Sequence, residues 1–446
     1  MTQVSAARKA AVRVLGDVRR REGRARDIMR SSPQLAPLSD RDRALASRIV
    51  LGVVASRGLL DKTIDARCTR RSHLEPKVRD ALRIATYELL FLATPDAVAV
   101  SQGVGLVRMV APRAAGLANA VLRRVAELDV PVREDTLNRV RAGGCELGDL
   151  TLVSGYPQWL LRRIGEERGA EAARLTALSA LEPAPVYVGT NEGLHGVQET
   201  ERILVDAGLA PCKTDVEGAF LLRKPAALAR LSLVESTDVV VADLSAQRIA
   251  QSVVTGQAGT VLEIGQGRGT KTILMLGAAR RNGDVIRVKG VESEAFKVRV
   301  TQERLERAGW AAYAQSYCLD ARELASKDGT VQASGPFDAV FVDAPCSGTG
   351  TLRRHPEICW SLKAADVDAL SNLQLQMLLA ASGCVRKGGV LCYATCSLLE
   401  QENQRLVEQF LNSARGKEFM LVEEPFVSLP MPDGPDGHFC ARMQRI

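Results

Sequence analysis

The chain has 446 residues, of which 46% are apolar, 25% charged and 4% aromatic. It is too long for one compact domain and too rich in apolar residues for a disordered chain, so we expect two or three folded units. Ten cysteines without a CxxC pair or zinc-ligand spacing exclude a disulfide scaffold and favour a metal-free protein in a reducing compartment. No stretch approaches the roughly 18 consecutive apolar residues of a membrane span, and the first residues lack the apolar core of a signal peptide. We therefore expect a cytoplasmic protein.

Basic residues are concentrated at the start of the chain. Residues 1–130 hold 24 Lys and Arg against 13 Asp and Glu, a net charge of +11, whereas the remainder holds 35 against 39, a net charge of −4. A basic module followed by a mildly acidic one indicates that the first binds a polyanion such as RNA. The alternative interpretation is a surface that only keeps the protein in solution.

Apolar residues within 1–130 recur at helical spacing, as in Ala7, Ala11 and Leu15. The pattern predicts an all-α domain of five or more helices, with Ser39 placed to cap one of them.

The middle of the chain changes character twice. Residues 131–155 are polar and rich in glycine, which predicts a linker around one weak helix. Residues 156–240 begin with the helical segment YPQWLLRRIGEERG and continue with short alternating segments such as APVYVGTN. This pattern indicates a small α+β subdomain, which we expect to bind RNA.

Short apolar runs alternate with helical windows over residues 241–446. The runs are TVLEIG, DVIRVKGVE, YAQSYCLD, FDAVFVDAPC, GGVLCYATCS, FMLVEEP and HFCARMQRI. This alternation predicts a Rossmann-like α/β domain with a mostly parallel, seven-stranded sheet. Ligands of such sheets bind at the carboxyl ends of the strands, so the residues after each run are candidates for the site.

The first three runs end in residues suited to a nucleoside. The loop after the first run consists of Gly265, Gln266, Gly267, Arg268, Gly269, Thr270 and Lys271. Its glycines allow the backbone to approach a ligand closely, and its spacing is not that of a phosphate-binding P-loop. The second run ends in Glu292, which can accept hydrogen bonds from ribose hydroxyls, and the third ends in Asp320. Together these features resemble the S-adenosylmethionine site of Rossmann-like methyltransferases.

The next two runs end in cysteine motifs. Asp343 and Cys346 follow FDAVFV, and Cys396 follows GGVLCY. If these strands are neighbours, about 4.8 Å apart, two thiols and one carboxylate converge. A single cysteine is most simply a buried packing residue. Two cysteines at adjacent strand ends beside a nucleoside pocket indicate nucleophilic catalysis.

Three segments, DAPCSGTGTLRRHPEICW, YATCSLLEQEN and DGHFCARM, resemble the bacterial RNA cytosine-C5 methyltransferases of the Fmu/Sun family. The basic helical region is similar to the NusB-like RNA-binding domain that such enzymes carry in front. The resemblance implies methylation of a cytidine in small-subunit ribosomal RNA, with S-adenosylmethionine as cofactor.

The resemblance also implies roles for the cysteine motifs. Cys396 would attack carbon 6 of the cytosine, Cys346 would assist product release, and Asp343 would contact N3 of the base. The cofactor would be held by the loop of residues 265–271 with Glu292, Asp320 and Asp343.

Three residues after the first cysteine motif are candidate RNA contacts. Arg353 and Arg354 are placed to bind phosphate. His355 would orient the substrate strand, with helix capping or packing as the alternative.

The glycine loop departs from the family pattern. Relatives read DLCAAPGGKT where this chain reads EIGQGRGTKT, so only Gly269, Lys271 and Thr272 correspond. We expect the replacement to alter the affinity for the cofactor. Lys271 is either part of the site or a surface cation.

Two other functions fit parts of the sequence. A DNA cytosine methyltransferase would use the cysteine of the Pro-Cys motif, Cys346, as its nucleophile. A non-catalytic, antitermination-like RNA-binding scaffold would need only the basic helices.

Overall fold

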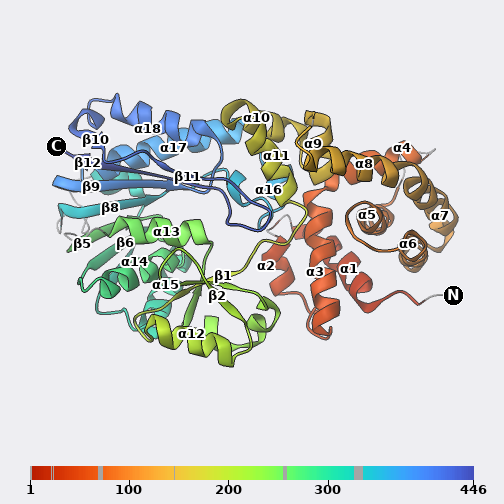
Figure 1. Cartoon of the computed structure of the whole chain (residues 1–446), viewed down its shortest axis with the longest axis horizontal. Coiled ribbons are helices and arrows are strands. Elements are labelled where there is room, and N and C mark those ends of the chain that lie inside the picture. The colour runs from red at the N-terminus through yellow and green to blue at the C-terminus, as the bar shows by residue number, and fades with distance from the viewer. Residues whose placement is uncertain are drawn as a thin grey trace. The chain divides into compact units, whose positions relative to one another are not determined.

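The computed structural model in Figure 1 describes residues 3–21, 23, 25–68, 74–144, 146–254, 259–325 and 335–446. The chain divides into two compact units. The first comprises Met1–Ala184, Leu352–Leu362 and Met431–Asp433, and the second comprises Pro185–Thr351, Lys363–Pro430 and Gly434–Ile446.

The first unit is built from helices, as predicted. They are α1 (Ala6–Arg21), α2 (Ala25–Arg30), α3 (Asp40–Ala55), α4 (Arg57–Arg67), α5 (Pro76–Phe91), α6 (Asp96–Val110), α7 (Ala115–Arg124), α8 (Val130–Arg141), α9 (Leu147–Ser154), α10 (Gln158–Arg168), α11 (Ala170–Ser179) and the short α16 (Ile358–Ser361). The apolar stripes form one core, in which Ala7, Ala11 and Leu15 of α1 are buried. Ser39 caps α3 by accepting a hydrogen bond from the backbone N–H of Asp42.

Residues 131–155 are more ordered than the predicted linker. They contain most of α8 and all of α9, where the sequence pattern indicated one weak helix. Glu146 and Asp149 cap α9 reciprocally, and α9 buries Leu150 and Val153. The polar residues of this range therefore lie mostly on the outer faces of two helices, each of which buries only a few side chains.

A buried ion pair joins α1 to α5. Arg8 donates two hydrogen bonds to Glu88, of 2.8 and 2.5 Å, and Glu88 is fully buried. Replacement of Arg8 by methionine leaves this carboxylate without its counter-charge, so we expect the helical unit to lose about 3–5 kcal/mol of unfolding free energy. Thermal unfolding followed by circular dichroism, with hydrogen exchange in α1 and α5, measures the loss. The control Arg13→Met removes an exposed arginine that donates a hydrogen bond to Gln34, and equal stabilities of the two variants would contradict the expectation.

The second unit begins with a small antiparallel sheet. Its strands are β1 (Tyr187–Thr190), β2 (Pro211–Lys213), β3 (Ala219–Leu222) and β4 (Val239–Val241), in the order β2-β3-β1-β4, accompanied by α12 (Val197–Asp206). Residues 185–241 form this α+β part, whereas the predicted subdomain began at residue 156; α10 and α11 belong to the first unit instead.

The main sheet follows. Its strands are β5 (Thr260–Ile264), β6 (Arg287–Glu292), β7 (Ala314–Cys318), β8 (Phe337–Asp343), β9 (Val385–Thr395), β10 (Phe419–Leu421), β11 (Phe426–Ser428) and β12 (His438–Arg445). The order is β10-β12-β9-β8-β5-β6-β7, with β11 paired to β12. Strands β5 to β9 are parallel to their neighbours, and β12 is antiparallel to β9. The predicted Rossmann-like class is confirmed, with eight strands among the described residues rather than seven.

Helices cover both faces of this sheet (Figure 1). They are α13 (Leu244–Val253), α14 (Thr270–Arg281), α15 (Ala295–Arg307), α17 (Ala364–Ser382) and α18 (Gln404–Leu411). Helices α17 and α18 pack with Val340 and Val342 of β8 on one face, whereas α13, α14 and α15 pack with Phe341 on the other. Because helices cover both faces of the sheet, a ligand can reach the ends of the strands but not the faces.

The nine cysteines within the described ranges are all free thiols. None of the helices described is long and apolar enough to cross a membrane.

Candidate active site

The loop between β5 and α14 passes close to the end of β8. Gly265 has a φ angle of +79°, and a Cβ there would lie 2.3 Å from the backbone oxygen of Asp343. Gly269 has a φ angle of +70°, and a Cβ there would lie 2.7 Å from Thr301. Both positions therefore require glycine, and the sequence encodes the close approach of the loop to β8.

A chain of buried hydrogen bonds supports this loop. Gln266 Nε2 donates to the hydroxyl of Thr272 (3.1 Å), which in turn donates to Glu263. Burial raises the pKa of Glu263 to about 8. The loop contains one buried acceptor, Gln266 Oε1, to which none of the described residues donates a hydrogen bond.

The two carboxylates of the neighbouring strands lie at strand ends. Glu292, at the end of β6, accepts the N–H groups of Gly267 (3.0 Å) and Glu294 (3.1 Å), one on each oxygen. Asp320 follows β7 and accepts the N–H and the guanidinium of Arg322, whose hydrogen bonds lower the pKa of Asp320. Each carboxylate oxygen can accept two hydrogen bonds. Because Oε1 of Glu292 also accepts the hydroxyl of Ser293 (3.3 Å), the capacity for a further hydroxyl donor lies on Oε2, whereas Asp320 shares its oxygens with Arg322.

The structure brings the two cysteine motifs together. Strands β8 and β9 are parallel neighbours, and the loops that follow them place Cys346 Sγ 3.3 Å from Cys396 Sγ. The backbone N–H of Cys396 also points at Cys346 Sγ, at 3.3 Å. The convergence of two thiols at adjacent strand ends, expected from the sequence, is present.

The ionisation of the two thiols is unequal. The hydrogen bond with the Cys346 thiol lowers the pKa of Cys396, and the charge of Lys271 lowers it further against the opposing effects of burial and of Asp343. The same hydrogen bond, together with burial, raises the pKa of Cys346 well above its ordinary range. Of the two thiols, Cys396 therefore ionises at the lower pH.

Lys271 belongs to this site rather than to the surface. Its Nζ lies 2.5 Å from Asp343 Oδ2, and its side chain is 19% exposed. Burial lowers the pKa of Lys271, but the charges of Asp343, Cys396 and Glu263 outweigh burial and raise it. A cation is thus paired with Asp343, and its charge acts on Cys396.

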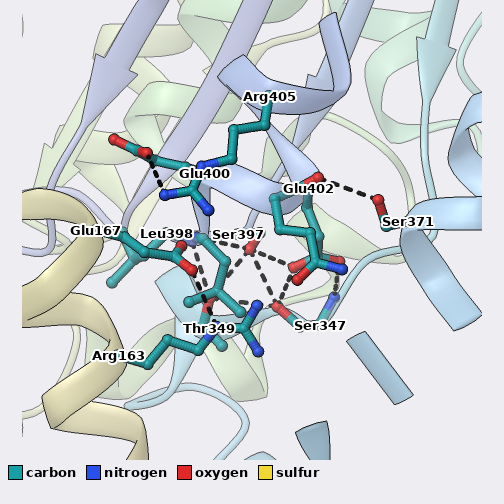
Figure 2. Close-up of polar contacts among 12 residues, drawn as sticks. Arg163, Glu167, Ser347, Thr349, Ser371, Ser397, Leu398, Glu400, Glu402 and Arg405 are labelled. Atoms are coloured by element: carbon teal, nitrogen blue, oxygen red, sulfur yellow. Dashed lines mark hydrogen bonds and ion pairs between the residues drawn. The ribbon is translucent and has the colours of Figure 1, made fainter. Parts of the chain in front are cut away.

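A polar cluster contains the residues that directly follow the two cysteines, and Figure 2 shows its hydrogen bonds. We call Ser347, Thr349, Ser397 and Glu402 the serine–glutamate cluster. Glu402 accepts hydrogen bonds from both serine hydroxyls and is fully buried. Sequence reasoning missed this residue, although each cysteine motif signals the cluster by a serine directly after the cysteine.

His438 was assigned no role from the sequence, yet it lies next to the site. Phe439 of β12 pairs with Thr395 of β9, so His438 begins its strand beside the end of β9 that leads to Cys396. Burial and the charge of Lys271 lower the pKa of His438 against the opposing charge of Asp243. The histidine is therefore neutral near pH 7.

The candidate RNA contacts lie in the segment 352–362, which the contacts group with the helical unit. Arg353 donates to the backbone oxygens of Met431 (2.9 Å) and Pro432 (3.0 Å), so part of its guanidinium holds the chain. The backbone oxygen of Arg354 accepts a hydrogen bond from Arg26. His355 Nδ1 lies 3.7 Å from Glu357.

The remaining loop residues face outward. The side chain of Arg268 is exposed, and its backbone oxygen accepts a hydrogen bond from Arg304 (3.0 Å). Arg304 also donates to the hydroxyl of Thr270 (2.7 Å). The arginine that replaces the family's proline thus adds a cation at the rim of the glycine loop.

Comparison with known proteins agrees with this geometry. Residues 5–127 match the NusB family, and residues 251–443 match the family described as 16S rRNA methyltransferase RsmB/F. The chain is 29% identical over 426 residues to ribosomal RNA small subunit methyltransferase B of Sodalis glossinidius, covering 92% of each. It is 28% identical to the protein of the same name from Yersinia pestis, covering 91% of each.

The fold has solved counterparts. The crystal structure of NSun6 from Pyrococcus horikoshii with SFG superposes with a TM-score of 0.56 at 16% identity, covering 66% of this chain and 99% of that one. The resemblance drawn from the cysteine motifs is confirmed. The chain is an RNA methyltransferase with a NusB-family domain at residues 5–127 and, at residues 251–443, a methyltransferase domain that matches the RsmB/F family.

Proposed function

We propose that this protein transfers a methyl group from S-adenosylmethionine to carbon 5 of a cytidine in small-subunit ribosomal RNA, through a transient bond between Cys396 and carbon 6. The names of the relatives from Sodalis glossinidius and Yersinia pestis support the substrate. The observation that carries the proposal is the unequal pair of thiols, 3.3 Å apart, at the ends of β8 and β9.

The residues of the glycine loop fit the cofactor. Gly265 and Gly269 leave room that a Cβ would fill, and Glu292 Oε2 can still accept a hydrogen bond from a ribose hydroxyl. The loop 265–271 with Glu292, Asp320 and Asp343 would hold S-adenosylmethionine, which supplies an electrophilic methyl group when bound. Arg322 would have to share Asp320 with the cofactor.

The first step follows from the weak nucleophilicity of carbon 5. The Cys396 thiolate adds to carbon 6 of the cytosine, and the electrons displaced toward N3 make carbon 5 able to attack the methyl group. Asp343 would contact N3, where negative charge develops, and Lys271 offsets part of the local negative charge. The target carbon is unreachable within a stacked helix, so the cytidine would be unpaired or flipped out.

Release requires a base for the proton of carbon 5. Once Cys396 is bonded to carbon, Cys346 loses the thiolate that kept it protonated, and its pKa falls. After passing its own proton to water, Cys346 would take the proton of carbon 5 while Cys396 leaves as a thiolate. Both cysteines then regain their starting states. The same asymmetry argues against a DNA-type assignment with Cys346 as nucleophile.

Bisulfite sequencing of ribosomal RNA tests the proposed function directly. RNA from cells that lack the gene should lose one protected cytidine in the small-subunit RNA, and the wild-type gene should restore it. An unchanged pattern of protected cytidines would contradict the proposal.

The glycine loop provides a separate prediction. Gly265→Ala combines a φ angle of +79° with a clash against the backbone of Asp343, so we expect binding of S-adenosylhomocysteine to weaken by about 30-fold or more, as 2 kcal/mol implies. Isothermal titration calorimetry measures the change. Gly283→Ala is the control, because its φ angle is +83° but nothing lies within 4 Å of the new Cβ. Equal affinities in the two variants would exclude a cofactor role for the turn.

A further inference from the structure

We propose that Glu402 is a positioning residue, whose buried carboxylate sets the separation at which Cys346 and Cys396 act as a pair. It lies in the segment YATCSLLEQEN after Cys396, in the short helical turn of Glu400–Glu402 that follows β9. The inference rests on the proposed function, in which both sulfurs act on one base.

Glu402 receives four hydrogen bonds from neutral donors. One oxygen accepts the backbone N–H of Ser347 (2.8 Å) and the amide of Gln374 (2.9 Å), and the other accepts the hydroxyls of Ser347 and Ser397, each at 2.5 Å. Four donors can occupy all the acceptor sites of a carboxylate. Both oxygens of Glu402 are therefore held by groups from the two cysteine loops and from α17.

The two serines connect the carboxyl group of Glu402 to the reacting atoms. Ser347 and Ser397 directly follow Cys346 and Cys396, so each bond to Glu402 fixes the backbone next to a thiol. The loops are joined further by the N–H of Gly350, which donates to the backbone oxygen of Cys396 (2.9 Å). Displacement of a reacting group by about 1 Å can cost on the order of 100-fold in rate, so the geometry of this cluster bears directly on turnover.

The charge of Glu402 also acts on the thiols. The pKa of Cys346 is raised chiefly by its hydrogen bond to Cys396 and by burial, and the charge of Glu402 adds to the rise. The pKa of Cys396 is lowered chiefly by that hydrogen bond, and Glu402 opposes the change. Removal of the charge should therefore make both thiols ionise at lower pH.

Glu402→Gln tests the inference, because it keeps the shape but replaces one acceptor oxygen with a donor. We expect methylation to fall about 100-fold, S-adenosylhomocysteine affinity to stay within about twofold, and the pH midpoint for alkylation of Cys396 by iodoacetamide to decrease. If Cys396 ionises more easily in the variant but methylation is slower, the loss of rate comes from the altered positions of the two sulfurs and not from a weaker nucleophile. The matched control is Glu400→Gln. Glu400 lies two residues before Glu402 in the sequence, and its carboxylate pairs with Arg405.

The outcomes separate this inference from the proposed function. Alkylation of Cys396 needs no RNA, so it tests Glu402 even if the wild-type protein methylates nothing. Wild-type turnover in Glu402→Gln, or an unchanged alkylation midpoint, would overturn the inference. If Glu402→Gln fails to bind S-adenosylhomocysteine, Ser397→Ala removes only one donor from the carboxylate. That variant should lose about tenfold in rate with intact cofactor binding, and an undiminished rate would overturn the inference.

Discussion

Replacement of Cys396 by alanine is expected to lower methylation by about 10⁴-fold or more, because loss of a covalent nucleophile removes the whole reaction path. The variant should still bind S-adenosylhomocysteine, since the glycine loop is untouched. Methylation of small-subunit ribosomal RNA with radiolabelled cofactor measures the rate. The control is Cys212→Ala, which removes a half-buried thiol from β2.

Cys346→Ala distinguishes the two sulfurs. Without the group proposed to take the proton of carbon 5, the adduct with Cys396 should accumulate, so we expect a protein–RNA complex that survives denaturing electrophoresis and a turnover rate about 100-fold lower. If instead Cys346→Ala abolishes adduct formation and Cys396→Ala does not, the assignment of roles is reversed.

Lys271→Met is expected to have the second-largest effect. The side chain pairs with Asp343 at 2.5 Å and lowers the pKa of Cys396. Removal of the cation should raise the pKa of Cys396 toward or above its ordinary value of 9.0, so that less thiolate is present near pH 7. We expect the rate to fall by about 100-fold or more, because a buried pair is broken as well.

The sign of the pH dependence checks this account. The wild-type thiol ionises below its ordinary range, so the alkylation profile of Cys396 in Lys271→Met should move to higher pH, opposite to the shift expected for Glu402→Gln. Lys213→Met, which removes an exposed cation paired with Glu201, should leave the profile unchanged. A Lys271→Met profile that coincides with the wild type would show that the cation does not act on the thiol.

Much of the site was predictable because strand periodicity is local. Apolar runs fix where each strand of a parallel sheet ends, and the ligand-facing residues follow at those ends. Gly265, Glu292 and Cys396 could thus be assigned from the sequence to the same edge of the sheet. The proximity of Cys346 and Cys396 needed one further assumption, that their strands are neighbours, which the sheet order confirms.

The contacts that tune the site could not be derived in this way. Lys271 meets Asp343, 72 residues later, and Glu402 meets Ser347, 55 residues earlier. Such pairs depend on side-chain directions after the sheet has formed, and neither periodicity nor spacing encodes them. The helices of residues 131–155 were underestimated because their apolar sides are short.

The most direct test of the central claim is to identify the residue that bonds to the base. RNA with 5-fluorocytidine at the target position, incubated with the wild-type protein and S-adenosylmethionine, should form a lasting adduct, because fluorine leaves no proton for release. Mass spectrometry of the digested adduct should find the nucleotide on the peptide that contains Cys396. A nucleotide on the Cys346 peptide, or no adduct with RNA that is otherwise methylated, would contradict the account.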